Sequence, residues 1–139
     1  MQMIHKLWKY KYGLAGAAFA ASVVALPVTA QTPGLAMLGQ LERGGWQLTD
    51  RDGGASQRIC LGDTAQLIQI RHQRSACTRF VVADGNAEVT VGYDCGTAGY
   101  GRTTIRRETN RLVQIETQGV VRGAPFSQTF EGRRIGACG

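Results

Sequence analysis

The sequence predicts a mainly β protein: a single curved antiparallel β-meander of about seven strands, with one short α-helix and two disulfides. Short segments that alternate apolar and polar residues are separated by glycine, asparagine and aspartate, which is typical of strands joined by tight turns. Four cysteines follow an N-terminal apolar segment that resembles an export signal. Together these features predict a small exported domain that disulfides help to stabilise.

The first 30 residues have the organisation of a signal peptide. Residues 1–12 carry three lysines and no acid, residues 13–26 form an apolar run, and Pro27 ends that run. Small residues precede Gln31, so we expect cleavage between Ala30 and Gln31 and a periplasmic or secreted product. A retained anchor is the alternative, but 14 apolar residues are fewer than the roughly 20 that span a bilayer. No transmembrane segment is therefore expected after cleavage.

The exported chain is expected to begin with a flexible leader over residues 31–44, because prolines and glycines recur there. The disulfide-stapled domain then covers residues 45–139. Its first strand starts at Trp46, where apolar and polar residues alternate, and a turn over residues 50–54 leads to a second strand over 57–61. Asp63 with Gln66 forms a capping-box pattern that predicts the short helix.

From Thr78 onward the pattern is that of an antiparallel meander. A turn near residues 84–86 predicts a hairpin, and Gly123 marks the last turn. The glycine-rich residues 95–101 suggest a link between strands, since they match no phosphate-binding fingerprint. The expected strands cover residues 78–82, 87–93, 102–108, 111–118 (extending towards 121) and 126–135.

Strand parity predicts how the cysteines pair. If Gly85 and Asn86 form the hairpin loop, Phe80 lies opposite Val91, and Cys77 and Cys95 then point to opposite faces. The predicted disulfides are therefore Cys60 with Cys77 and Cys95 with Cys138, although a bulge near the C-terminus would change the second. A zinc site is disfavoured because the spacings of 17, 18 and 43 residues contain no C-x-x-C pair.

The charge of the chain allows two interpretations. The whole chain has a net charge of +6, and without its three lysines 13 arginines face 10 acids, which leaves +3. We predict a candidate anion-binding face of Arg102, Arg106 and Arg111, because guanidinium groups match carboxylate and phosphate oxygens. An arginine-biased composition gives the same pattern without any such role, and this is the favoured interpretation. An exported protein meets little nucleic acid, so if this face binds a partner, we expect an anionic envelope component or an acidic protein.

Catalytic and metal sites find little support in the sequence. His72 is the single histidine after residue 30, and its polar surroundings predict a solvated loop residue. Oxidised cysteines exclude a Cys–His nucleophile pair, and one histidine excludes a multi-histidine metal site. Ten acids leave a carboxylate pair open without singling one out. We therefore expect no enzyme, no cofactor and no metal.

Several segments together resemble a known family. They are Gly45-Trp46, Ile59-Cys60-Leu61, Cys77, Asp94-Cys95-Gly96 and the ending from Gly132 to Cys138. In these the chain resembles small exported proteins of Gram-negative bacteria that are catalogued as a periplasmic domain of unknown function. The resemblance implies a signal peptide followed by one four-cysteine β domain, and it implies no catalytic residue or cofactor.

The sequence thus predicts an exported, non-catalytic binding or envelope-associated domain. A carrier of a small apolar ligand, held in a cavity of the curved sheet, is the first alternative. An enzyme of unrecognised type is the second. An empty apolar cavity would favour the carrier, converging acids would favour the enzyme, and a solid core with free arginines would favour surface binding.

Overall fold

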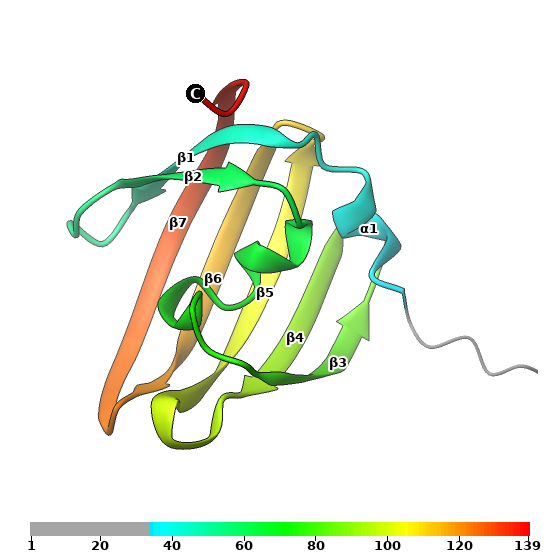
Figure 1. The fold of residues 1–139 in the computed structure, drawn as a ribbon. Coiled ribbons are helices and arrows are strands. Elements are labelled where there is room, and N and C mark those ends of the chain that lie inside the picture. Colours follow the sequence, from blue (N-terminus) through cyan, green and yellow to red (C-terminus); the bar gives the residue numbers. More distant parts are fainter. Residues whose placement is uncertain (1–33) are drawn as a thin grey trace, which may run out of the picture. The chain divides into compact units, whose positions relative to one another are not determined.

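A computed structural model describes residues 34–139, so the predicted signal peptide and the first residues of the leader lie outside the described part (Figure 1). This part contains seven strands, one short α-helix and three 3₁₀ turns. The helix α1 is Ala36–Gly39 and the 3₁₀ turns are η1 Thr64–Leu67, η2 Ile70–His72 and η3 Gly96–Ala98. The strands are β1 Gly44–Asp50, β2 Gln57–Leu61, β3 Thr78–Asp84, β4 Glu88–Asp94, β5 Gly99–Thr109, β6 Leu112–Val121 and β7 Ala124–Gly136.

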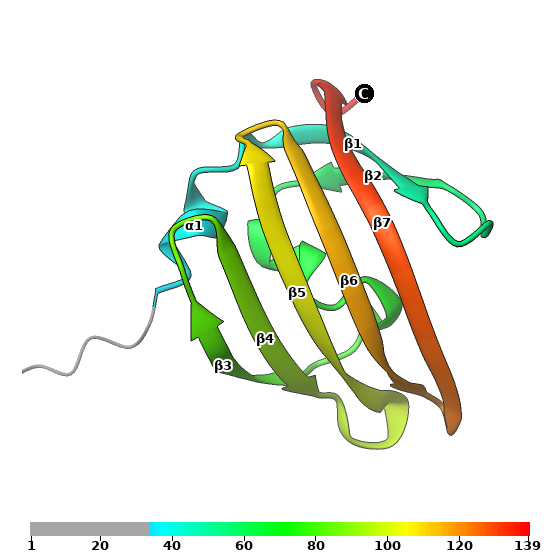
Figure 2. The same cartoon turned by 180° about the vertical axis from the view of Figure 1, so that it is seen from behind.

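All seven strands form one open antiparallel sheet in the order β2-β1-β7-β6-β5-β4-β3. Strands β3 to β7 follow one another as a meander, and β1 and β2 join at the free edge of β7. This confirms the predicted fold class. In Figures 1 and 2 the strands β1 and β2 cross one end of the sheet, so the sheet curls at that corner.

The connection between β2 and β3, residues 62–77, lies across one face of the sheet, which we call the inner face (Figures 1 and 2). Its Leu67 and Ile68 are fully buried. The hydroxyl of Thr103 on β5 donates a hydrogen bond to the carbonyl of Ile68, which fastens the connection to the sheet. The core consists of these side chains and the inward residues of the strands, among them Trp46, Leu48, Val91, Ile105, Val113, Ile115 and Phe130.

The prediction of a flexible leader is wrong for residues 34–44, the part of it that the structure describes. Met37, Leu38 and Leu41 are buried members of the core. The amide of Glu42 donates to the carbonyl of Asn110, which ties this segment to the turn between β5 and β6. Because burial of three apolar side chains outweighs the flexibility of nearby glycines, residues 36–44 belong to the domain.

The helix predicted after Asp63 is present as two 3₁₀ turns. The Asp63 carboxylate accepts from the amide of Ala65, as expected of a cap, and Gln66 accepts from the amide of Gly62. Gln69 has a non-helical backbone and separates η1 from η2. The single α-helix of residues 34–139, α1, lies elsewhere, within the predicted leader.

The register of the β3–β4 hairpin differs from the prediction by one residue. The amide of Gly85 donates to the carbonyl of Glu88, so the turn is formed by Asn86 and Ala87. A β-bulge lies between Val81 and Ala83, and Val81 rather than Phe80 lies opposite Val91. A bulge places an extra residue on one strand, and this changes which side chains share a face.

The predicted disulfide pairing is wrong for the same reason. The disulfides are Cys60–Cys138 and Cys77–Cys95. Thr78 lies opposite Asp94, so Cys77 and Cys95 follow as the next facing pair. The Cys60–Cys138 disulfide crosses over β1 at Gly45, which has Cys60 on the neighbouring strand β2 and Gly136 on the neighbouring strand β7. Glycine is needed there, because a side chain at position 45 would collide with the carbonyl of Ala137.

Two disulfides are compatible with an extracellular or periplasmic protein. Within residues 34–139 we find no helix with the length and apolar character needed to cross a membrane.

Candidate anion-binding site

The three arginines predicted to bind anions do not form one site. Arg102 and Arg106 share the outer face of β5, as predicted, but two of the three guanidinium groups meet carboxylates. Arg106 lies 3.4 Å from Glu108, and Arg111 lies 3.6 Å from Glu42. Exposed pairs of this kind contribute little stability, but they place a negative charge beside each cation.

Arg102 is different, since no ion pair involves it within the described residues. It lies with Gln118 between two shallow hollows of about 170 and 340 Å³ on the outer face. Glu116 lines the first of these hollows, so one acid balances the one arginine. The first hollow therefore has no net positive charge, and the second holds the single charge of Arg102.

A stronger concentration of positive charge lies at the end of the sheet where β5 begins. A hollow of about 530 Å³ is lined by residues 70–75 together with Ala98, Val121 and Arg122. We call it the arginine hollow, because Arg71, Arg74 and Arg122 line it and no acidic residue does. All three arginines are exposed, and none forms an ion pair with an acid of residues 34–139.

One carbonyl connects the segments that carry these arginines. The carbonyl oxygen of Ala98 in η3 accepts from the backbone amide of Arg122 at 3.0 Å and from His72 Nε2 at 3.0 Å. It thereby joins η2, η3 and the β6–β7 turn. Arg122 and Gly123 both have positive φ, 46° and 82°, the conformation of a two-residue hairpin turn that matches the twist of the strands. The predicted last turn thus begins one residue earlier, at Arg122.

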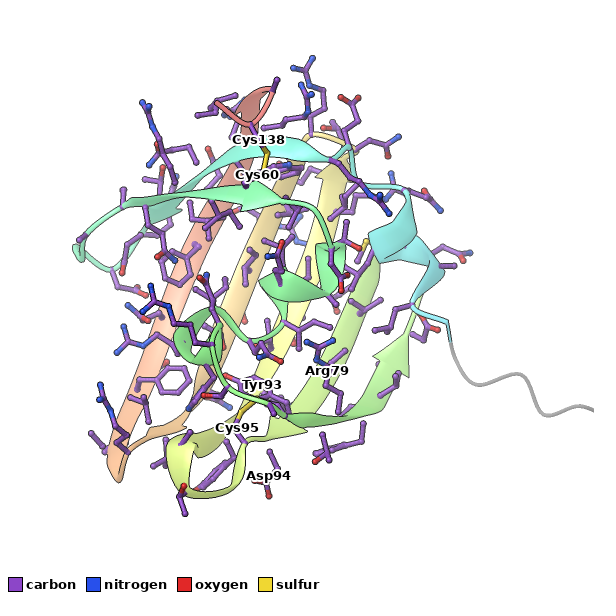
Figure 3. All side chains as sticks on the ribbon, viewed as in Figure 1. Cys60, Arg79, Tyr93, Asp94, Cys95 and Cys138 are labelled. Atoms are coloured by element: carbon purple, nitrogen blue, oxygen red, sulfur yellow. A yellow bond between two sulfur atoms is a disulfide. The ribbon has the colours of Figure 1, made fainter. Side chains whose placement is uncertain are left out.

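A buried glutamine fixes the segment that carries Arg74. The Gln69 side-chain amide donates to the carbonyls of His72 and Ser75 at 2.9 and 3.0 Å. Its oxygen accepts from Arg79 of β3 at 2.7 Å, and Figure 3 shows Arg79 close to the connection. Only 5% of Gln69 is exposed, so its amide is largely shielded from water at the centre of these hydrogen bonds.

Arg71 is also held in place. Its guanidinium carbon lies 5.7 Å from the centre of the Phe126 ring, within the range of a cation–π contact. Phe126 belongs to β7 and does not line the hollow itself, so this contact links the η2 segment to β7. The segments that carry the three arginines are thus connected to one another, and the Arg71 side chain is held by its ring contact.

His72 lines the hollow but is buried, and it is not the solvated residue that its sequence context predicts. Only 3% of it is exposed. Since a carbonyl can only accept, Nε2 carries the proton given to Ala98, and in the neutral ring Nδ1 accepts from the Tyr93 hydroxyl at 3.1 Å. Burial raises the pKa of Tyr93 above its ordinary 10.0, although a hydrogen bond with Thr117 and the charge of Arg71 act in the opposite direction.

The His72 ring therefore has both nitrogens engaged and serves to connect segments. A neighbouring side chain would disturb this arrangement, because a β-carbon at Gly99 would lie 2.9 Å from His72 Nε2. Gly99 has a φ of +121°, which also favours glycine. Within residues 34–139 no three histidine, cysteine or acidic side chains lie close enough to hold a metal ion.

The sequence carries only a weak signal for this site. Arg71, His72 and Arg74 are close in the chain, but Arg122 is 48 positions beyond Arg74, and only the fold places them together. The Arg-Gly pair at the β6–β7 turn is the one local sign, since a two-residue turn projects its first side chain at the end of a hairpin.

Comparison with known proteins adds no functional assignment: no family model, no curated protein and no solved structure matches this chain.

Proposed function

We propose that this chain is an exported, non-catalytic binding domain that holds an anionic component of the cell envelope in the arginine hollow. The observation that supports this proposal is a hollow lined by Arg71, Arg74 and Arg122 without a single acid. Elsewhere on the domain, in contrast, Arg106 and Arg111 have acidic partners. An uncompensated cluster of guanidinium groups attracts anions over a range set by the ionic strength.

Export is part of the proposal. The predicted signal peptide over residues 1–30, cleaved between Ala30 and Gln31, delivers the chain to the periplasm, where its disulfides form. We include in the proposal that the chain belongs to the family of small four-cysteine periplasmic proteins, since such membership would agree with export.

The carrier and the enzyme are less well supported. Leu67 and Ile68 of the 62–77 connection occupy the place on the inner face that an apolar ligand would need. His72 is engaged on both nitrogens, which leaves it no free position for acid–base work. Binding by exposed arginines requires neither a cavity in the core nor a free catalytic group.

Binding to heparin, a polyanionic probe, tests the proposal with two matched variants. One changes Arg71, Arg74 and Arg122 to glutamine, and the control changes Arg106, Arg111 and Arg133, which also meets an acid. Both variants lose three positive charges. We expect the first to weaken heparin binding at about 0.05 M salt by about tenfold or more, and the control by much less.

Equal losses in the two variants would show that net charge alone attracts heparin, and the proposal would fail. The proposal would also fail if neither variant weakened heparin binding. Binding that resists about 0.5 M salt would also contradict it, because exposed charge interactions are screened at that ionic strength.

A further inference from the structure

The chemistry of the arginine hollow defines its ligand more closely. Arg71 comes from η2, Arg74 from the loop after it and Arg122 from the β6–β7 turn, so the three cations line the hollow from separate segments. A planar carboxylate presents its oxygens in one plane. A tetrahedral oxyanion presents oxygens in several directions and can accept from guanidinium groups on more than one side.

The charge of the hollow also favours a tetrahedral oxyanion over a carboxylate. Three guanidinium groups without a carboxylate among the lining residues favour an anion that carries more than one negative charge. His72 also lines the hollow, and both of its ring nitrogens are already engaged, one with Tyr93 and one with the carbonyl of Ala98. Ser75 also lines the hollow and supplies a hydroxyl.

The size of the hollow is compatible with a small ligand group. Its volume of about 530 Å³ falls within the range of small-molecule sites, and it is open to solvent. Phe126, which contacts Arg71 through a cation–π interaction, holds that guanidinium over its ring while the arginine stays exposed to solvent.

We propose that the arginine hollow binds a terminal phosphate group in its doubly charged form. This rests on the proposed function, since it names the class of anion that the same site takes. Inorganic phosphate, a sugar phosphate and a lipid with a terminal phosphate share this chemistry. A phosphodiester carries one charge and lacks a terminal oxyanion with three free oxygens, so it is a poorer ligand.

The first test is calorimetry with the whole exported chain and small probes at pH 7.5 and pH 5.0. The probes are glucose 1-phosphate, inorganic phosphate, inorganic sulfate, methyl sulfate and acetate. Phosphate monoesters lose their second proton near pH 6, so only about a tenth of the ester is doubly charged at pH 5. We expect glucose 1-phosphate to bind about tenfold more weakly at pH 5.0 than at pH 7.5.

Inorganic sulfate is the matched control, because it is tetrahedral and doubly charged at both pH values. Its affinity should be the same at both, which separates the charge of the ligand from any change in His72 or elsewhere in the protein. Methyl sulfate and acetate, with one charge each, should bind more weakly than sulfate. Arg74→Gln should weaken glucose 1-phosphate binding, whereas Arg102→Gln on the outer face should leave it unchanged.

The source of the phosphate is resolved by a further arm. Vesicles of phosphatidylcholine containing phosphatidic acid present a terminal phosphate, and vesicles containing phosphatidylglycerol present a phosphodiester at equal molar fraction. Binding to the phosphatidic acid vesicles but not to glucose 1-phosphate assigns a lipid source. Binding to glucose 1-phosphate but not to these vesicles assigns a soluble source.

Acetate or methyl sulfate binding as tightly as glucose 1-phosphate would overturn the proposed ligand class while leaving anion binding intact. The ligand class is likewise overturned if no small probe binds but heparin still binds through the hollow. If heparin binding also proves independent of Arg71, Arg74 and Arg122, the proposed function fails with it.

Discussion

The two ends of the sheet use arginine in opposite ways. At the end where β5 meets β6 through the turn at Asn110, Glu42 lies 3.6 Å from both Arg111 and Arg134. At the other end the β6–β7 turn and η2 present Arg71, Arg74 and Arg122 with no acid in the same hollow. Arginine content alone therefore does not locate a binding site; the positions of the acids do.

Each end also carries one disulfide, and the two have different surroundings (Figure 3). Cys60–Cys138 joins the edge strand β2 to the C-terminal residues, and both of its cysteines are exposed. Cys77–Cys95 joins the connection that carries η2 to the start of η3, and Cys95 is only 8% exposed. The Cys60–Cys138 disulfide closes most of the domain into one loop, whereas the Cys77–Cys95 disulfide joins segments that line or adjoin the arginine hollow.

The largest expected effect separates these two disulfides. They span 78 and 18 positions, so chain entropy predicts losses of about 4.5 and about 3 kcal/mol when each pair is replaced by alanine. Denaturant unfolding should therefore rank the Cys60 and Cys138 variant as the less stable. Anion binding should show the reverse order, because only Cys77–Cys95 connects segments of the hollow. If the two folded variants lost anion binding equally, the Cys77–Cys95 disulfide would not be what positions the segments of the hollow.

A smaller effect concerns the ionisation of Tyr93 beneath the hollow. Because its pKa is raised by burial, the unfolded chain loses this proton near pH 10 while the folded chain keeps it. Stability from this group is thus present below pH 10 and falls as the pH rises above it, by at most about 1.4 kcal/mol per pH unit. Tyr93→Phe should flatten the fall in urea-unfolding free energy between about pH 10 and 11.

The exposed Tyr100, at the same end of the sheet, supplies the matched control. Tyr100→Phe should retain the wild-type slope. A slope that does not change in Tyr93→Phe would show that its hydroxyl is not shielded from water.

The fold can be predicted from the sequence because strand alternation and turn residues are local signals. Trp46 and Leu48 alternate with polar neighbours, and the sequence predicts β2 with its observed bounds, Gln57–Leu61. The capping role of Asp63 is also local and is present. Each of these depends on residues only a few positions apart.

The disulfides and the site depend on distant relationships. One bulge beside Val82 and a turn shifted to Asn86 and Ala87 move Cys77 opposite Cys95, and neither feature has a distinctive sequence pattern. His72 looks polar in its segment, yet the fold buries it against Tyr93 and Ala98. The charge state of a surface likewise follows from pairs such as Glu42 with Arg111, which are 69 positions apart.

The measurement that tests the central claim most directly is an NMR map of backbone amide shifts during titration with inorganic sulfate. The claim is that anions bind at the arginine hollow and not at the end where arginines meet acids. We predict saturable shifts at residues 71–75, at Ala98 and at Arg122, with small changes at Arg106 and Arg111. Larger saturable shifts at Arg106 and Arg111, with residues 71–75 unmoved, would contradict the claim.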